Sequence, residues 1–175
     1  SLDKDTVNYD QMRYEGFGPN GTSIIVEALT DNRNRTASNV RSAFQKFGGS
    51  MGETGSVSHA FNHYGFVRYN KDVTSEEDFF NFSIEGGAED CFIEEDTYEA
   101  VSTPETLSNL YNYLDKKFGE PLSSGFQWKP VTYVAIEGDK LKSLINLLNE
   151  LDNDEDVQQV FSNFEASDEE LAKFA

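Results

Sequence analysis

Short alternating segments and helical stripes follow one another along this chain in three cycles. In the first cycle the turn-forming segment 17–21 separates residues 12–16 from the β-branched run 22–29, which predicts two strands joined as a hairpin. A helix is expected next, because apolar residues then recur at helical spacing. Its stripe consists of Val40, Phe44 and Phe47. We expect Thr36 to cap this helix and Gly48 to end it.

The second cycle predicts two helices with a pair of strands between them. Ser75 precedes the segment EEDFFNFSIE as a capping residue, and Gly86 stands where that helix should end. Residues 91–95 and 97–102 then have the composition of strands. The next helix is expected to start at Thr103-Pro104, because proline is tolerated in a first helical turn.

The third cycle predicts one more helix and a closing strand. Asp139 is expected to open the helix, and the segment 157–165 is expected to form the strand. The helix has an apolar stripe of Leu141, Leu144, Ile145, Leu148 and Leu151. Residues 1–8 form a polar lead, and the acidic residues 167–175 are expected to form a fraying tail.

The order of these elements predicts an α+β fold. Because the strands alternate apolar with polar residues, we expect two-layer mixed or antiparallel sheets with helices on one face. The pattern breaks near Gly65 and again near Pro130. These breaks suggest two lobes, with the second lobe inserted in the first.

Composition excludes several classes of protein. Of the 175 residues 37% are hydrophobic and 13% are aromatic, which is too apolar for a disordered chain. The single cysteine excludes an internal disulfide and a cage of several thiolates around a metal. No apolar run approaches the ~18 residues of a membrane-spanning helix, so no membrane association is expected.

Charge is distributed unevenly along the chain. The net charge is −18, yet residues 1–70 carry seven basic and seven acidic side chains, whereas residues 71–175 carry seven basic and 25 acidic ones. All five arginines lie in the first 68 positions. Two interpretations stay open: a locally positive face on a negative body, or a solvated acidic surface with scattered arginines.

Three motifs imitate cofactor or metal sites. Residues 16–21 match G-x-G-x-x-G, but a strand rather than a helix is predicted next, and Thr22 stands where a Walker lysine is required. His59 and His63 are spaced four apart in an alternating segment without the catalytic glutamate of a zinc helix. The acidic run 152–156 lacks the glycine and glutamate of a calcium loop. We therefore expect no cofactor and no metal.

No arrangement of side chains predicts catalysis. Cys91 lies beside acidic residues, which disfavour a thiolate, and no nucleophile elbow is present. The acidic pairs along the chain are neighbours in sequence and do not flank a substrate. The protein is therefore expected not to be an enzyme and to have no small-molecule substrate.

The segment TDNRNRT, residues 30–36, is the strongest candidate for binding chemistry. Guanidinium groups match phosphate oxygens, asparagine amides bond base edges or backbone, and a helix start adds a positive dipole end. As a loop before a helix it would contact nucleic acid. The candidate residues are Asn32, Arg33, Asn34 and Arg35, supported by Arg13, Arg41 and Lys46. The alternative is an Asx-rich turn whose arginines pair with Asp31 or Glu27.

Several segments in succession resemble the YebC/PmpR family, whose mitochondrial relative is a translational activator of cytochrome c oxidase subunit one. They are RYEGFGPNG (13–21), TDNRNRT (30–36), FQKFGGS (44–50), GSV (55–57) and DVQQVFSNFE (156–165). The resemblance implies a three-domain α+β protein of which the N-terminal basic helical domain is not in this sequence. It also implies that the second domain, 9–64 plus 131–166, is discontinuous and contains the third, 65–130.

The resemblance further implies a non-catalytic regulator of gene expression in the cytoplasm, or in the mitochondrial matrix of a eukaryote. Its partner would be nucleic acid, either DNA in transcription or ribosomal RNA on the ribosome. In the alternative, the acidic span 65–130 docks a basic ribosomal or polymerase partner without touching nucleic acid. The residues expected to bind that partner are Glu76, Glu77, Glu94 and Glu95. The sequence does not determine the oligomeric state.

Overall fold

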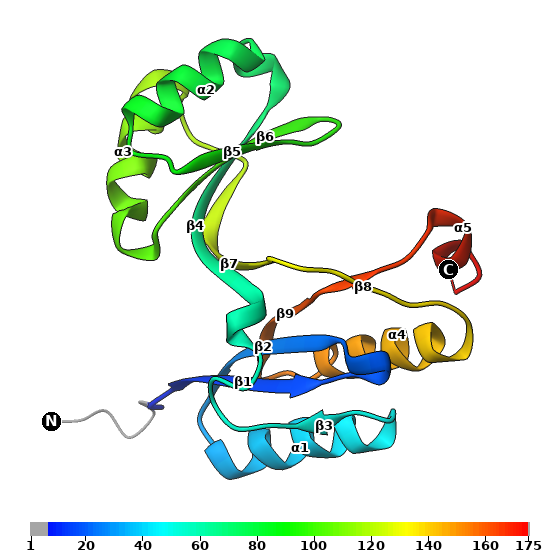
Figure 1. Cartoon of the computed structure of the whole chain (residues 1–175). Coiled ribbons are helices and arrows are strands. Elements are labelled where there is room, and N and C mark those ends of the chain that lie inside the picture. The colour runs from blue at the N-terminus through cyan, green and yellow to red at the C-terminus, as the bar shows by residue number, and fades with distance from the viewer. Residues whose placement is uncertain (1–6, 175) are drawn as a thin grey trace, which may run out of the picture. The chain divides into compact units, whose positions relative to one another are not determined.

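The computed structural model describes residues 7–174, which separate into two compact units (Figure 1). The first unit comprises the residues up to Asn62 together with those from Pro130 onward. The second unit is the continuous segment His63–Lys129. Both units combine a sheet with helices, so the predicted α+β class is confirmed.

An antiparallel sheet in the order β3-β1-β2-β9 forms the centre of the first unit. Its strands are β1 (Asp10–Phe17), β2 (Ser23–Thr30), β3 (Ser50–Met51) and β9 (Val157–Ser162). The predicted hairpin is confirmed, because β1 pairs with β2 from Asp10 opposite Thr30 to Phe17 opposite Ser23. The 3-10 turn η1 (Pro19–Gly21) connects the two strands. A short parallel pair, β8 (Val134–Ala135) with β10 (Phe164–Glu165), makes the unit mixed.

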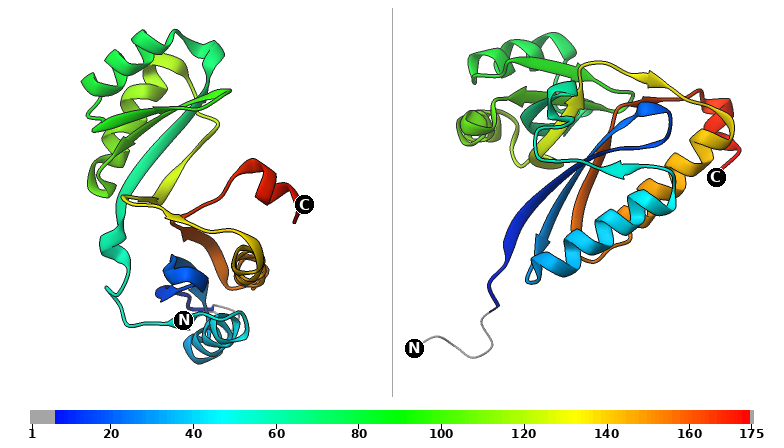
Figure 2. Two further views of the ribbon diagram at one scale, coloured as in Figure 1. Left: turned by 45° about the vertical axis from the view of Figure 1, so that its right-hand side comes forward. Right: turned by 60° about the horizontal axis from the view of Figure 1, so that its bottom comes forward.

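Helices α1 (Arg33–Lys46) and α4 (Gly138–Asp152) pack side by side on one face of this sheet (Figure 2). Tyr14, Ile24, Val26 and Ala28 project from the sheet into the shared core. The helices contribute Val40, Ala43, Phe44, Leu141, Leu144, Leu147 and Leu151. Burial of these apolar side chains provides the main driving force for the unit.

Helix α1 begins three residues before the predicted cap. Asn32 is the N-cap, with extended backbone, and its side chain accepts a hydrogen bond of 3.1 Å from the backbone N–H of Arg35. Thr36, predicted to be the cap, is fully buried inside the helix. Asparagine is among the best N-cap residues, which explains why the helix starts earlier. Arg33, Asn34 and Arg35 therefore lie in a first helical turn, and the prediction of an arginine loop is wrong.

The end of the chain also differs from its prediction. Helix α5 (Asp168–Ala172) occupies the segment expected to fray, and Ser167 caps it by accepting a hydrogen bond of 3.1 Å from the N–H of Glu170. Leu171 and Phe174 pack against the core of the first unit. The two apolar contacts and the Ser167 cap therefore stabilise a helix in a segment whose acidic composition alone predicts a fraying tail.

The second unit contains a sheet in the order β5-β6-β4-β7 with two helices on one face (Figure 1). Its strands are β4 (Phe61–Asn70), β5 (Asp90–Ile93), β6 (Thr97–Ser102) and β7 (Ser123–Pro130). Its helices are α2 (Glu76–Glu85) and α3 (Leu107–Phe118). The predicted cap Ser75 is confirmed, since its hydroxyl accepts from the N–H of Asp78 at 3.2 Å. Two 3-10 turns lie in this unit, η3 (Lys71–Val73) and η4 (Pro104–Thr106), and η4 delays the predicted start of α3. A further 3-10 turn, η2 (Ser58–Ala60), precedes β4 and belongs to the first unit.

Candidate nucleic-acid interface

Helix α1 differs in charge from the rest of the chain. Its 14 residues, RNRTASNVRSAFQK, include four basic side chains and no acidic one, although the chain contains 32 acidic residues. Four exposed residues spaced along one side of the helix form what we call the outer face of α1: Asn34, Ser38, Arg41 and Gln45. Each carries a hydrogen-bond donor, which is the property that phosphate oxygens require.

Arg35 is held by two carboxylates at the first turn of α1. Its guanidinium donates to both oxygens of Asp156, at 2.8 Å to Oδ1 and 3.1 Å to Oδ2, and at 2.8 Å to Asp31. The hydrogen bond from Arg35 holds the pKa of Asp156 below its ordinary value, and the Thr36 hydroxyl adds to this effect. The same contacts raise the pKa of Arg35. Arg35 therefore fastens α1 to the turn before β9.

The remaining basic residues of α1 are bound less firmly. Arg33 donates to Asp10 at 3.0 Å, which lowers the pKa of that carboxyl, and Lys46 pairs with Glu150 at 3.1 Å. All four of these side chains are at least 40% exposed, so each pair contributes little to stability and can exchange with a phosphate. Arg41 forms no ion pair with any residue between 7 and 174, and it faces solvent.

Arg13 lies apart from the other candidates. It is on β1, where its neighbour Tyr14 enters the core beneath α1 and α4, so Arg13 projects from the opposite face of the sheet. Its Nε donates to Glu27 at 2.7 Å. The structure therefore groups Asn32, Arg33, Asn34, Arg35, Arg41 and Lys46 on α1 and its cap but does not bring Arg13 to them. Of the pairs named in the alternative interpretation, the one with Asp31 is formed by Arg35, whereas Glu27 pairs with Arg13 and not with an arginine of residues 30–36.

The four glutamates expected to bind a basic partner lie in the second unit. Glu76 and Glu77 form the first turn of α2 and line a pocket with Phe80, Cys91 and Ile93. Glu94 directly follows Ile93, and Glu95 lies in the turn between β5 and β6, both exposed. Glu76 and Glu77 are therefore placed beside apolar side chains that the sequence does not connect with them.

Sequence reasoning missed two buried carboxylates, of which the first is Glu15 on β1. It is only 2% exposed and accepts hydrogen bonds from the backbone N–H groups of Gly55 at 2.8 Å, Val57 at 3.1 Å and Ser58 at 2.7 Å. Burial alone would raise the pKa of Glu15, but these donors together hold it below its ordinary value. Glu15 thus fixes the loop after β3.

The second buried carboxylate is Glu99 on β6, which is also 2% exposed. One oxygen accepts from Arg68 at 2.6 Å, and the other accepts from Gln127 at 2.6 Å and pairs with Lys129 at 3.1 Å. Burial acts to raise the pKa of Glu99, and these three donors outweigh it and lower the pKa. Glu15 thus holds a loop in place, whereas Glu99 joins strands β4, β6 and β7. In the sequence each carboxylate alternates with core-facing apolar residues, a pattern that predicts a solvent-facing position, so no local signal marks their burial.

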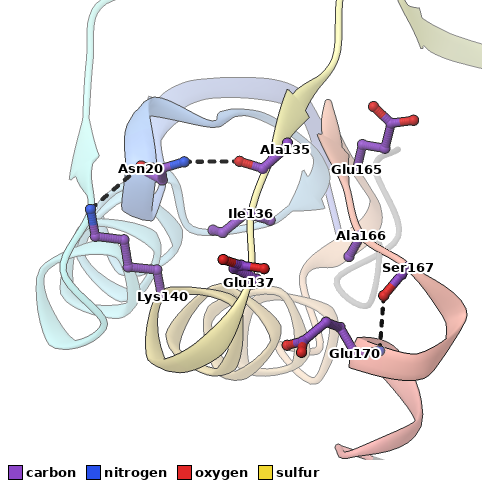
Figure 3. A pocket seen from close by; sticks show the side chains of 9 residues that line it. All are labelled: Asn20, Ala135, Ile136, Glu137, Lys140, Glu165, Ala166, Ser167 and Glu170. Carbon is purple, nitrogen blue, oxygen red and sulfur yellow. Dashed lines mark hydrogen bonds between the residues drawn. The ribbon is translucent and has the colours of Figure 1, made fainter.

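The glycine-rich loop has a structural role. Asn20 adopts a left-handed backbone with φ of 63°, donates from its side chain to the carbonyl of Ala135 at 2.9 Å and accepts from Lys140 at 3.4 Å (Figure 3). The adjoining pocket of about 740 Å³ is also lined by Glu137, Glu165 and Glu170. Its carboxylates would repel a phosphate group. The loop leads into strand β2, as predicted, and not into a helix.

No group of three or more histidine, cysteine, aspartate or glutamate side chains among residues 7–174 is placed to hold a metal ion. Among the helices described above, none has the length and apolar content needed to cross a bilayer.

The fold is shared with a solved structure of a conserved hypothetical protein from Aquifex aeolicus. That chain is 36% identical, and the match has a TM-score of 0.82, covering 95% of the present chain and 69% of the other. The present chain belongs to the TACO1/YebC family, because the model of that family's second and third domains matches residues 9–164. At the level of the family, this indicates a regulatory role of the transcriptional-regulator type.

Proposed function

We propose that this protein is a non-catalytic regulator of gene expression that contacts nucleic acid through the outer face of α1. The observation that carries the proposal is the absence of acidic residues from this 14-residue helix, in a chain with a net charge of −18. Membership of a regulatory family supports it. We place its site of action in the cytoplasm, or in the mitochondrial matrix if the source is a eukaryote.

The side chains on α1 suit the phosphate backbone better than base edges. Arg41 supplies one charge with no ion-pair partner among residues 7–174, and Asn34, Ser38 and Gln45 supply neutral donors. Contacts of this kind fix the position of a protein on nucleic acid without reading its sequence. Arg33 and Lys46 add charge once a phosphate replaces Asp10 or Glu150 as their partner.

The overall charge favours ribosomal RNA over bare duplex DNA. Affinity for a duplex grows with the number of phosphates neutralised, and one helix with four basic residues on a body of charge −18 neutralises few. A ribonucleoprotein offers a folded RNA surface together with basic proteins that tolerate an acidic body. The proposed partner is therefore ribosomal RNA within the ribosome, and DNA is the alternative to be tested alongside it.

The test is co-sedimentation with ribosomes at low and high salt, using Arg41→Glu as the variant. Lys142→Glu is the matched control, because Lys142 is an exposed basic residue on α4 in the same unit and undergoes the same change of charge. Binding to a labelled DNA duplex is measured in parallel. Arg41 is preferred to Arg35, since removing Arg35 would also release Asp156 and disturb the helix start.

We expect salt-sensitive pelleting of the wild type that falls at least fivefold in Arg41→Glu and little in Lys142→Glu. Equal losses in both variants would show non-specific attraction and contradict a site on α1. Binding to the duplex in place of the ribosome would assign the same face to DNA. Absence of both interactions at low salt would refute the proposal for this chain.

A further inference from the structure

We propose that the groove between α2 and the edge strand β5 binds an extended basic peptide segment that inserts one bulky apolar side chain. The groove is lined by Glu76, Glu77, Phe80, Cys91 and Ile93 and has a volume of about 500 Å³. It lies in the second unit, whereas α1 belongs to the first. The inference goes beyond the proposed contact with nucleic acid and does not depend on it.

Strand β5 offers backbone groups to a further strand. It is the terminal strand of the order β5-β6-β4-β7, and it pairs with β6 from Asp90 opposite Val101 to Ile93 opposite Tyr98. The N–H of Glu94 bonds the carbonyl of Thr97, which makes this a hydrogen-bonded pair of the antiparallel ladder. Because such pairs alternate, the peptide groups of Cys91 and Ile93 point away from β6. An added strand would pair with these groups.

The unbound edge is blocked by a side chain of its own. The carboxylate of Asp90 accepts a hydrogen bond of 2.8 Å from the backbone N–H of Cys91. This contact satisfies an outward donor without a second strand, and a negative charge at the edge disfavours uncontrolled pairing. An incoming carbonyl can replace the carboxylate, because the carboxylate is exposed and returns to water.

The walls of the groove are apolar and exposed. Phe80 is 47% exposed and Ile93 is 39% exposed, while Phe79, next to Phe80, is fully buried in the core. One turn after Phe80, Ile84 continues the stripe at 44% exposure. Helix α2 therefore presents apolar residues on two sides, of which only one is needed to hold it on the sheet. The other side is suited to an apolar side chain of a partner.

The rim of the groove selects a basic partner. Glu76 and Glu77 lie at its edge, Glu94 and Glu95 follow Ile93, and α2 contains no basic residue. Lysine or arginine beside the inserted apolar residue would be attracted, and an acidic peptide would be repelled. A second copy that met this groove through its own groove, as in a twofold-symmetric dimer, would bring the same acidic rim. Like charges therefore argue for a different, basic partner.

The test begins with selection of peptides from a phage-displayed library of random dodecapeptides on the immobilised wild-type chain. We expect the enriched peptides to carry two or more basic residues next to a bulky apolar one. A synthetic copy of an enriched peptide is then titrated into the isotopically labelled protein and followed by NMR. Amide shifts should concentrate in β5 and α2. Enrichment of acidic or uncharged peptides, or shifts centred elsewhere, would overturn the proposal.

Variants then separate the groove from the rest of the surface. Ile93→Asp should weaken binding of the synthetic peptide at least tenfold, and Glu76→Lys with Glu77→Lys should do the same. The matched control is Leu122→Asp, since Leu122 is 55% exposed in the same unit. A peptide in which proline replaces the residues that face β5 should not bind, because proline has no backbone N–H to donate to the strand. Equal weakening by the Leu122 control, or full binding of the proline version, would contradict strand addition.

Sedimentation equilibrium of the protein alone tests whether a second copy of this chain occupies the groove. A dimer that Ile93→Asp dissociates would overturn the peptide proposal, and a monomer supports it. The Arg41→Glu variant should bind the peptide as the wild type does. A failure of the nucleic-acid proposal therefore leaves this result unchanged, and the converse also holds.

Discussion

The Thr36 hydroxyl lies 2.7 Å from Oδ2 of Asp156 and donates to it, which joins the first turn of α1 to a position 120 residues further along the chain. Thr36 is fully buried, and the side chain of Asp156 is 13% exposed. The pair therefore fixes the start of the proposed interface helix against the turn that precedes β9.

Replacing Thr36 by valine should destabilise the protein by about 1–2 kcal/mol. Valine preserves the shape of the side chain but leaves the mostly buried carboxylate of Asp156 without one donor. Urea denaturation measures the loss. Ser38→Ala, at an exposed position of the same helix, is the control and should change the free energy of unfolding by less than about 0.5 kcal/mol. Equal effects of the two variants would contradict a special role for this pair.

Replacing Glu15 by glutamine should cost about 1–3 kcal/mol, because a buried acceptor of three backbone N–H groups loses its charge and half of its acceptor oxygens. Hydrogen exchange should then accelerate at Gly55, Val57 and Ser58. Glu53→Gln is the control within the same loop, since Glu53 is exposed. Unchanged exchange at these three amides would show that Glu15 does not hold the loop.

Stability should fall as the solution becomes acidic. Glu15 and Glu99 both have pKa values below the ordinary 4.5, so each binds a proton more readily when the chain is unfolded. The contribution of these two carboxylates to the free energy of unfolding is complete above about pH 4.5. It is lost as the pH falls through their lowered pKa values in the folded protein. Thermal unfolding between pH 7 and pH 3 measures this dependence. In Glu15→Gln the acid limb should be shallower, and an unchanged limb would contradict the assignment.

Replacing Gly16 by alanine should destabilise the first unit by about 1–3 kcal/mol. A Cβ at this position would lie 2.7 Å from the carbonyl oxygen of Ser50 and 2.7 Å from the ring of Phe44. Gly16 faces Met51 in the pairing of β1 with β3, so relief of the clash would push β3 away. Calorimetry measures the loss, and an unchanged melting temperature would contradict the close packing.

Local signals predicted elements well where caps and breakers agree with the apolar stripe. Ser75 and Gly86 bound α2 in the structure as they do in the sequence, and the hairpin of β1 and β2 follows from its turn residues. The start of α1 was mispredicted because two capping residues, Asn32 and Thr36, compete there. The contact of Thr36 with Asp156 resolves the competition, and it is invisible in a local window.

The candidate sites depend more strongly on tertiary structure. The basic composition of α1 could be read from its sequence, but the partners of Arg33 and Arg35 lie on other segments. The separation of Arg13 from these residues follows from the two faces of a strand, a step that requires knowing which face α1 covers. Phe80 and Ile93 are distant in sequence, and only the pairing of β5 as an edge strand places them in one groove.

The insertion of one unit into the other has a consequence for synthesis on the ribosome. All strands and helices of the segment His63–Lys129 are complete once that segment has emerged. In the first unit, β2 pairs with β9, with Val26 opposite Val160, so this sheet needs residues that follow the inserted segment. The hairpin of β1 and β2 must therefore wait, with its apolar face uncovered by α4, until α4 and β9 are made. The inserted unit can thus mature before the unit that carries α1 is complete.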